Sequence, residues 1–248
     1  MISEALATAG NKLVSPYPPK GTDYWAARFW DRDTCEQDSA LGPHYRDQKT
    51  VVARYIETYG KDTERVLEFA CGTGEFTRLA AELTPAKEIT AVDVSAEGLA
   101  RTRQRVVHDN LRLVEGDFWK DNNVGTSDVV MCLDAIHHLG DVRSVLERLK
   151  TFVNPGGVFI GNLWTVDHFH EFQRYRYGAV EHLMRCAVFF GSAAMIRLSG
   201  GRLNSGSYRT QLLFTDKIPS ILNSVFGPGN VLELDKQRYF TSFVCRVV

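Results

Sequence analysis

Residues 65–74 read Arg-Val-Leu-Glu-Phe-Ala-Cys-Gly-Thr-Gly, a short apolar run that ends in a glycine loop. Residues 76–83 then place apolar side chains at helical spacing, and Pro85 ends that pattern. Where a strand passes into a helix through glycines, backbone N–H groups can approach a ligand closely. The stretch therefore predicts a strand, a ligand-binding loop and a helix, as found in α/β proteins.

Strand and helix patterns alternate through the middle of the chain, as is typical of a doubly wound α/β sheet. The expected strands are residues 65–70, 88–93, 111–115, 128–133 and 158–163. The expected helices are residues 51–59, 76–83, 96–108, 142–153 and 218–225, with a turn at residues 154–157. Ser95 and Asp141 precede two of these helices. Residues 231–234 and 239–248 are joined by a link too short for a parallel crossover, so we expect an antiparallel hairpin.

The composition is that of a globular protein. The chain has 248 residues, 44% hydrophobic and 11% aromatic, which suits one large domain or at most two small ones. A formal net charge of −1 argues against a nucleic-acid binder and against disorder. No segment approaches the roughly 18 consecutive apolar residues of a membrane span, and the N-terminus does not resemble a signal peptide. Five scattered cysteines favour reduced side chains over a disulfide framework or a zinc site, so we expect a soluble, cytoplasmic protein.

Acidic residues lie at the ends of three successive predicted strands: Glu68, Asp93 and Asp117. In open α/β sheets these ends share one crevice, where a carboxylate can accept both hydroxyls of a ribose. A carboxylate beside an exposed backbone amide suits the edge of adenine. The glycine loop has no basic residue, so the set fits an adenosine that carries a sulfonium cation rather than phosphates. The alternative is structural: Glu68 caps the next helix, and the two Asp residues are turn acids.

In these motifs residues 63–163 resemble the class I S-adenosylmethionine-dependent methyltransferases. The matching pieces, in the family's order, are residues 68–74, Asp93, Asp117-Phe118, residues 128–139 (DVVMCLDAIHHL) and residues 149–161 (LKTFVNPGGVFIG). The chain departs from the family at Ala70, where a glycine is frequent, and from a dinucleotide fingerprint at Thr77. The resemblance implies an α/β fold, a doubly wound seven-stranded mixed sheet of the Rossmann-like type. Its last strand would lie antiparallel beside the fifth.

The resemblance also implies S-adenosylmethionine as cofactor and S-adenosylhomocysteine as product. Glu68 would reach the methionine ammonium, Asp93 the ribose and Asp117 the adenine amino group. The remaining implied cofactor contacts are Ala70, Gly72, Gly74, Val94, Phe118 and Leu133, with Cys132 beside the last.

Aromatic residues near the N-terminus predict a lid over the cofactor. They are Tyr17, Tyr24, Trp25, Phe29 and Trp30, of which Tyr24 is counted among the cofactor contacts. Aromatic faces attract a sulfonium and exclude water. The alternative is that they form the core-facing stripe of a helix.

Methyl transfer to a hydroxyl needs a general base near neutral pH, whereas a neutral amine needs little more than alignment. His137 and His138 follow the fourth predicted strand, and Asp167 in the Asp-His-Phe-His run at 167–170 follows the fifth. We expect His138 or His137 to take or orient the acceptor proton, supported by Asp167. The alternative, that the histidine pair is scaffold for the next helix, stays open. The run at 167–170 has no spacing diagnostic of a metal site, so no metal is expected.

The expected organisation is a single methyltransferase domain over residues 1–248. Its parts are an N-terminal helical lid and first helix (1–62), a cofactor-binding core (63–163), a substrate-side insertion after the fifth strand (164–214) and the last helix with the hairpin (215–248). Within the insertion, the apolar residues 187–198 can be a pocket roof, an interface or core.

These features predict transfer of a methyl group from S-adenosylmethionine to a hydroxyl or amine of a small-molecule acceptor. A secondary metabolite, as in natural-product biosynthesis, is preferred because the flanks are elaborate. The rival functions are methylation of RNA or of a protein, and a non-catalytic cofactor-binding subunit. No nucleic-acid or membrane partner is expected, and the sequence leaves open whether the chain forms a homo-oligomer.

Overall fold

The computed structural model describes residues 2–14, 25–120, 123–203 and 212–248. Its centre is a seven-stranded sheet with the strand order β3-β2-β1-β4-β5-β7-β6. The first five strands run parallel, and β7 pairs antiparallel with β5 and β6. The predicted doubly wound mixed sheet and the predicted terminal hairpin are both confirmed.

The strands are β1 (Arg65–Phe69), β2 (Glu88–Asp93), β3 (Leu111–Glu115), β4 (Ser127–Cys132), β5 (Val153–Trp164), β6 (Val231–Lys236) and β7 (Phe240–Arg246). The helices before β4 are α1 (Ile2–Val14), α3 (Arg32–Gln37), α4 (Gly42–Tyr59), α5 (Glu75–Leu83) and α6 (Ala96–Arg105). Those after β4 are α7 (Val142–Lys150), α8 (Val166–Tyr177), α9 (Ala179–Leu198) and α10 (Ile218–Phe226). Two short 3₁₀ helices are η1 (Ile136–His138) and η2 (Thr215–Lys217).

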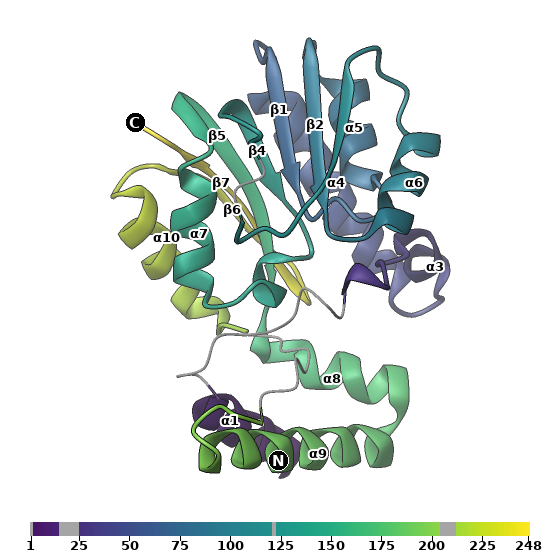
Figure 1. Cartoon of the computed structure of the whole chain (residues 1–248), viewed down its shortest axis with the longest axis vertical. Helices are drawn as coiled ribbons and strands as arrows, with labels where there is room; N and C mark the ends of the chain where they lie inside the picture. The colour runs from purple at the N-terminus through teal and green to yellow at the C-terminus, as the bar shows by residue number, and fades with distance from the viewer. Residues whose placement is uncertain (1, 15–24, 121–122, 204–211) are drawn as a thin grey trace.

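Helices cover both faces of the sheet (Figure 1), and each face has its own core. On one face, α7 and α10 pack against side chains such as Phe69, Val130 and Phe159. On the other, α4 and α5 pack against the alternate residues, among them Val66 and Ile160. Successive strand residues point to opposite faces, so a sheet buried on both sides consists of continuous apolar runs. Those runs are what made the central strands predictable.

The helix starts follow capping chemistry. The Ser95 hydroxyl accepts a hydrogen bond from the Gly98 N–H at the start of α6, and the Asp141 carboxylate accepts one from the Ser144 N–H at the start of α7. An N-cap oxygen of this kind satisfies one of the N–H groups that a helix start leaves without a partner. Both predicted helix starts therefore agree with the structure.

Some predicted boundaries were wrong. α6 ends at Arg105 rather than residue 108, and α7 ends at Lys150 rather than residue 153. Val153 pairs with Ser127 as the first residue of β5, and residues 154–157, predicted as a turn, belong to the same strand. The register shifts here, and the Gly156 N–H donates to the Val247 carbonyl over 2.7 Å. Pairing with neighbouring strands thus overrides the local turn preference of Asn, Pro and Gly.

Three helices that the sequence analysis did not assign, α1, α8 and α9, form a separate layer below the sheet, which we call the accessory helices (Figure 1). α1 packs on α9 through Val14, Ala193 and Ile196. The short helix α3, also not predicted, lies beside α4 instead. α8 and α9 occupy most of the predicted insertion after the fifth strand.

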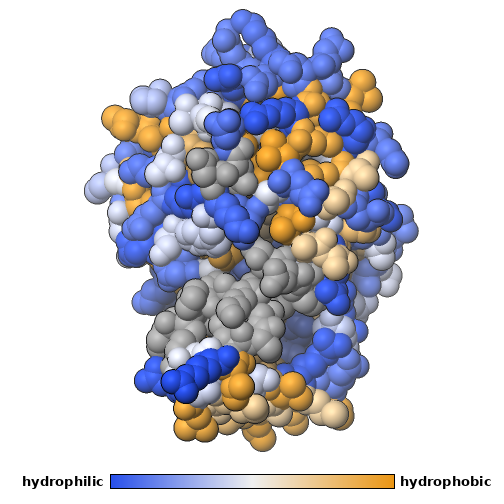
Figure 2. Space-filling view, in the orientation of Figure 1, coloured by the Kyte–Doolittle hydropathy of each residue, from blue (hydrophilic) through white to orange (hydrophobic). Residues whose placement is uncertain are grey.

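The outer side of α9 is apolar and exposed. Figure 2 shows hydrophobic residues at the lower end of the molecule, where the accessory helices lie. Exposed side chains of α9 include Val180, Met184, Val188, Met195 and Leu198. Contrary to the expectation from sequence, α9 has the length and composition of a membrane-crossing helix, with 22% of its apolar window buried. One such helix does not establish a membrane span, because helices of soluble proteins pass the same test.

We predict that Phe159→Ala lowers the free energy of unfolding by about 3–5 kcal/mol, since it opens a cavity in a dense core. The Phe159 ring is fully buried, stacks on Phe226 with ring centroids 5.8 Å apart and meets Phe243 at 6.0 Å. Urea denaturation followed by circular dichroism measures the loss. The control is Val107→Ala at an exposed site, expected within about 0.5 kcal/mol of the parent. Equal stabilities of the two variants would contradict the assignment of Phe159 to the core.

Candidate functional site

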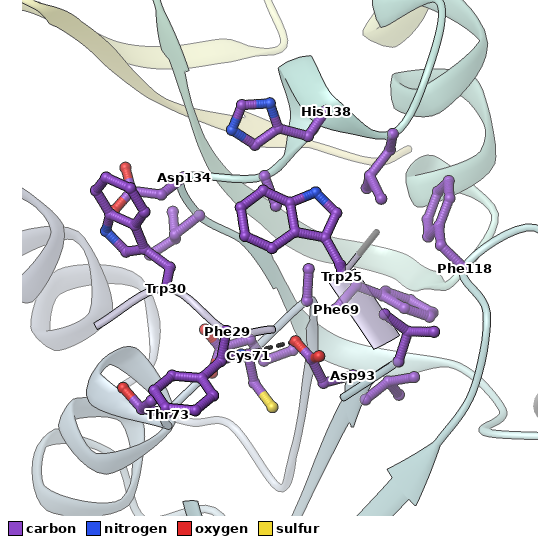
Figure 3. Close-up of a pocket in the computed structure, with 18 of the residues that line it drawn as sticks. Trp25, Phe29, Trp30, Phe69, Cys71, Thr73, Asp93, Phe118, Asp134 and His138 are labelled. Carbon is purple, nitrogen blue, oxygen red and sulfur yellow. Dashed lines mark hydrogen bonds between the residues drawn. The ribbon is translucent and has the colours of Figure 1, made fainter. Parts of the chain in front are cut away.

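The main pocket lies at the carboxyl ends of β1, β2 and β4, where the strand order of an α/β sheet reverses and ligands bind (Figure 3). It encloses about 1150 Å³ of space, a figure that includes volume open to solvent. Residues from the glycine loop, the strand ends, the segment 25–32 and the segment 133–139 line it. Of the predicted site residues, the lining includes Glu68, Ala70, Gly72, Asp93, Val94, Phe118, Leu133 and His138.

The glycine loop has an unusual backbone. Ala70, Gly72 and Gly74 all have positive φ, at 55°, 55° and 78°. An added side chain at Gly74 would come within 2.7 Å of the Thr102 methyl group, so α5 can approach α6 only with glycine there. Gly74 is the N-cap residue of α5 and does not line the pocket, so its cofactor contact stays a prediction and its structural role is the one seen here.

Asp93 is held in place by the backbone. Its two carboxylate oxygens accept hydrogen bonds from the N–H groups of Gly72 and Ser95, each over 2.8 Å. Burial raises the pKa of Asp93, and these backbone hydrogen bonds act in the opposite direction. The carboxylate thus faces the pocket in one fixed orientation, with lone pairs left over for a ligand.

Glu68 lies at the buried end of the pocket. Its side chain is 1% exposed, and the Thr77 hydroxyl donates a hydrogen bond to it. Burial raises the pKa of Glu68 to about 8. Thr77 stands where a dinucleotide fingerprint has its third glycine, so its hydroxyl gives that departure a physical role. A buried acid of this kind is suited to a cationic ligand group, which would favour its ionised form.

The predicted adenine side is only partly assembled from the predicted residues. Val94 and Phe118 line the pocket together with Trp119. Asp117 does not: its carboxylate accepts a hydrogen bond from the Trp119 N–H over 2.9 Å, closing a turn after β3. The Asp117 prediction thus finds no support in the lining, and the structural alternative of a turn acid describes its position. Leu133 lines the pocket as predicted, with Cys132 fully buried behind it.

Only one of the two predicted histidines lines the pocket. His138 lines the pocket, with its ring 5.7 Å from that of Trp25. His137 is 1% exposed, lies 6.1 Å from the ring of Trp164 and is not among the lining residues. The two imidazole rings contact each other at 4.0 Å, with His137 on the buried side and His138 on the pocket side. Of the two predicted proton acceptors, the structure therefore brings His138 and not His137 to the pocket wall.

Burial also weakens both imidazoles as bases. It lowers the pKa of His137 to about 3 and moves the pKa of His138 well below its ordinary value. Both rings are then neutral at physiological pH. His138 can orient a ligand by hydrogen bonding, but it holds a proton poorly.

Asp167 is not brought to the histidine pair. It lies in the first turn of α8, where its carboxylate accepts hydrogen bonds from the Thr215 N–H (2.8 Å) and hydroxyl (2.6 Å). These bonds lower the pKa of Asp167, although burial acts against them. It borders a second, open pocket with His168 and Lys217. The predicted support of the base by Asp167 was wrong, because its side chain ties the end of the insertion to α8.

Three of the five aromatic residues predicted to form a lid belong to the described part of the chain. Trp25, Phe29 and Trp30 all line the pocket (Figure 3), so the alternative of a core-facing stripe does not describe them. The Arg101 guanidinium lies over the Phe29 ring at 4.3 Å, which fixes this side chain against α6. Tyr17 and Tyr24 lie outside the described residues.

Sequence analysis missed Arg32 and Asp134, which both line the pocket. Arg32 donates to Asp134 over 2.6 Å and to Glu36 over 2.8 Å. Asp134 also accepts from Gln48 (2.7 Å) and from Asn162 (2.9 Å). Asp134 stands inside the quoted motif 128–139, so its position could have been noticed. No sequence signal indicates its partners, which come from distant parts of the chain.

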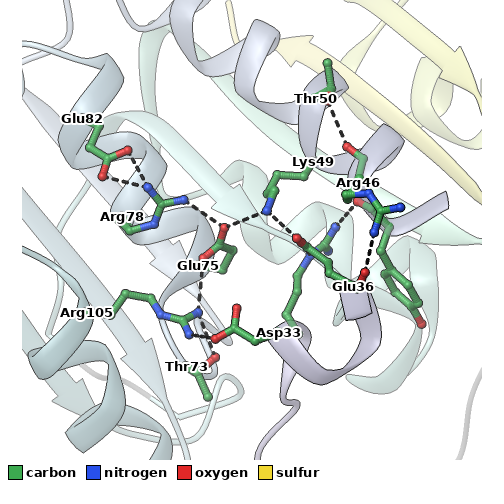
Figure 4. Close-up of polar contacts among 12 residues, drawn as sticks. Asp33, Glu36, Arg46, Lys49, Thr50, Thr73, Glu75, Arg78, Glu82 and Arg105 are labelled. Atoms are coloured by element: carbon green, nitrogen blue, oxygen red, sulfur yellow. Dashed lines mark hydrogen bonds and ion pairs between the residues drawn. The ribbon is translucent and has the colours of Figure 1, made fainter. Parts of the chain in front are cut away.

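A network of ion pairs anchors α3 to the body of the protein (Figure 4). Glu75, at the start of α5, pairs with Arg78 at 3.0 Å, Arg105 at 3.2 Å and Lys49 at 3.4 Å. Lys49 also pairs with Glu36 of α3. Glu75 is buried, so these charges are screened less than surface pairs. The network positions the segment that carries the aromatic lid.

Comparison with known proteins shows what these features are similar to. Residues 67–159 match a family model described as a methyltransferase domain. The chain is 26% identical over 160 residues to the malonyl-acyl-carrier-protein O-methyltransferase of Halalkalibacterium halodurans, covering 58% of this chain and 59% of that protein. The chain spans between 24% and 59% of the length of the first curated relatives it matches.

Two solved structures illustrate the shared fold. The N-methyltransferase NodS from Bradyrhizobium japonicum superposes with a TM-score of 0.55 at 16% identity, over 83% of this chain and 97% of that one. A complex of DhpI with SAH superposes with a TM-score of 0.57 at 22% identity, over 92% and 95%. At these identities the likeness shows the fold.

We predict that Glu68→Gln changes how stability depends on pH. Between pH of about 4.5 and 8, the unfolded chain carries an ionised Glu68 while the folded chain keeps the proton. The folded state thus binds more protons, and the free energy of unfolding falls as pH rises through this window. Glu68→Gln removes that contribution. Between about pH 5 and pH 8, the free energy of unfolding of the variant should therefore fall less than that of the parent, as measured by urea denaturation at each pH.

Glu57→Gln, at an exposed position of α4, is the matched control and should keep the pH dependence of the parent. Parallel stability curves for the parent and Glu68→Gln would show that burial does not raise the pKa of Glu68.

Proposed function

We propose that this chain, which carries a class I S-adenosylmethionine-dependent methyltransferase domain, transfers a methyl group to an amine or hydroxyl of a small molecule. The observation that carries the proposal is the pairing of Asp93 and Glu68 in one pocket, with aromatic residues opposite. We infer that the acceptor is a specialised metabolite, since the residues beyond the cofactor core are elaborate.

The residues present fit the cofactor by the chemistry of their groups. Asp93 offers fixed acceptor lone pairs for the ribose hydroxyls, and Val94, Phe118 and Trp119 offer apolar surface for adenine. Glu68 suits the ammonium group of the methionine part, and Arg28 supplies positive charge for its carboxylate. The backbone of the glycine loop lets the ligand approach the sheet closely. When bound, S-adenosylmethionine supplies a methyl carbon on a cationic sulfur, and this carbon forms a bond to the acceptor as its bond to sulfur breaks.

The protein's part in this displacement is alignment and exclusion of water. Trp25 and His138 form one side of the pocket, and their rings, with centroids 5.7 Å apart, contact each other and offer one surface on which an acceptor can lie. Because burial lowers the pKa of His138, we infer that His138 orients the acceptor by a hydrogen bond rather than storing its proton. Acceptors that lose their proton readily to solvent, such as amines, then place the least demand on the site.

The rival function, methylation of RNA or of a protein, calls for a docking surface. The formal net charge of −1 gives no support to binding of a polyanion. Among the curated relatives are a malonyl-acyl-carrier-protein O-methyltransferase and, at 27% identity over 143 residues, a ubiquinone biosynthesis O-methyltransferase of Pseudomonas aeruginosa. These names support a small acceptor group on this chain. Release of S-adenosylhomocysteine, measured against a panel of small amines and hydroxyl compounds and against bulk RNA and protein, distinguishes the two. Turnover with RNA or protein alone would overturn the small-molecule proposal.

We predict that Asp93→Ala weakens binding of S-adenosylhomocysteine by about 100-fold or more. Two hydrogen bonds to a charged group are lost, each worth about 1.5–3 kcal/mol. Isothermal titration calorimetry measures the dissociation constant, and circular dichroism verifies folding. Asp109→Ala removes a carboxylate from an exposed turn before β3 and should bind like the parent. An unchanged dissociation constant in Asp93→Ala would contradict the ribose role.

We predict that His138→Gln keeps kcat within about tenfold of the parent on the best acceptor of the panel, because glutamine still offers hydrogen bonds. His138→Ala should fall further. A general base contributes about 10²–10⁴-fold, so an equally large loss in both variants would instead assign proton transfer to His138. His168→Gln replaces a half-buried histidine of α8 that does not line the main pocket; it is the control and should match the parent.

A further inference from the structure

Three side chains of metal-ligating type meet where α8 and α9 pack together: His170 of α8 and His182 and Cys186 of α9. All three are buried, with exposed fractions of 7%, 3% and 6%. Their ligand atoms all lie within 4.8 Å of one another. None of the three lines the main pocket, so the cluster is separate from the site of the proposed methyl transfer.

The spacing within the cluster matches that of ligands around a zinc ion. His170 Nδ1 lies 3.0 Å from His182 Nε2, and Cys186 Sγ lies 3.7 Å from the same nitrogen. Zinc binds nitrogen at about 2.0–2.1 Å and sulfur at about 2.3 Å in a tetrahedron, which sets neighbouring ligand atoms roughly 3.3–3.6 Å apart. The two short separations are within a few tenths of an ångström of these values, and no pair of ligand atoms is more than 4.8 Å apart, so side-chain rotation would bring the third atom onto the same ion.

The secondary structure keeps these side chains together. His182 and Cys186 are four residues apart on α9, so both lie on the same face of the helix. His170 faces them from α8, and the turn at Gly178 brings the two helices into contact. The run at 167–170 does not reveal the cluster by itself, because two of the three side chains come from the next helix and meet His170 only through the packing of α9 on α8.

Hydrogen bonds link the three side chains, but those to sulfur are long. Between His170 Nδ1 and His182 Nε2 there is room for one proton, so only one of these nitrogens can donate to the other. The Cys186 sulfur lies 3.7 Å from His182 Nε2 and 3.9 Å from His182 Nδ1, which are long distances for hydrogen bonds. Buried polar groups are costly unless each has a partner. A single cation would accept a lone pair from all three atoms at once.

We propose that His170, His182 and Cys186 bind one zinc ion. A thiolate with two imidazoles is a donor set that zinc favours over magnesium or calcium. On binding, the Cys186 thiol releases its proton to solvent, and three bonds to the metal form. The fourth position stays available to water. The ion would fasten α8 to α9, and an ion pair of 2.5 Å between Glu4 and Arg174 separately joins α1 to α8.

The test uses the full-length chain with any affinity tag removed, since a histidine tag would bind zinc itself. After dialysis against dilute zinc, elemental analysis gives the metal content, and competition with a chromogenic chelator gives the affinity. We expect one equivalent of zinc for the parent. Cys186→Ser and His182→Gln should each bind more weakly by at least 10–100-fold, the loss that even an outer partner of a metal ligand causes.

Matched controls replace the same residue types outside the cluster. Cys35→Ser and His168→Gln should keep the parent affinity, because Cys35 belongs to α3 and His168 is bonded to Glu171. Cobalt added to the metal-free parent gives a second readout that needs no variant to fold. A thiolate-to-cobalt absorption band with tetrahedral visible bands supports the site. Zinc uptake equal in the parent and Cys186→Ser, or a cobalt spectrum without the thiolate band, overturns the proposal.

Discussion

The buried contact between Arg32 and Asp134 is the constraint on which the pocket depends. Arg32 is 2% exposed, and its guanidinium reaches Asp134, Glu36 and the Tyr45 carbonyl. Removing two charges from water is costly and is repaid only where geometry is good and the remaining donors and acceptors are satisfied. The Asp134 carboxylate meets this condition, since Gln48 and Asn162 also donate hydrogen bonds to it. The N-terminal flank, α4, the loop after β4 and β5 therefore converge at one carboxylate.

This convergence explains why the lid and the sheet form one site. Trp25, Phe29 and Trp30 precede Arg32 directly, so the ion pair fixes the chain that carries them. On the other side, Asp134 has a positive φ of 55°, a conformation that its hydrogen bonds must maintain. His138 lies one turn further along this segment. The groups that would hold the cofactor rest on the sheet, whereas those facing the acceptor depend on a polar network between distant segments.

The same distinction separates what the sequence predicts from what it does not. Strands and the terminal hairpin follow from apolar runs and link length, which are local properties, and Gly72 and Asp93 follow from the order of motifs. Asp117 and His137 do not line the pocket although their neighbours Phe118 and His138 do, and no local pattern in a turn or a 3₁₀ helix tells which residue faces a ligand. α1 escaped prediction because it buries Ser3, Gly10 and Val14 against a helix from the far end of the chain. Gly10 permits that approach, since an added side chain would lie 2.7 Å from the Phe189 ring.

The accessory helices are joined to the sheet through Trp164, the last residue of β5. Its indole packs against Phe172 of α8 at 4.3 Å, Phe240 of β7 at 5.2 Å and Tyr45 of α4 at 6.4 Å. It also lies 6.1 Å from His137, whose ring is in turn 4.0 Å from that of His138. Dense packing transmits displacement, because neighbouring side chains have little free volume to absorb it. A displacement of α8 would thus be transmitted through Trp164 and His137 to η1, whereas Asp93 and Glu68 have no place in this series of contacts. The strand ends that would hold the cofactor thus belong to the sheet, and the accessory helices are connected to it through the aromatic side chains around Trp164.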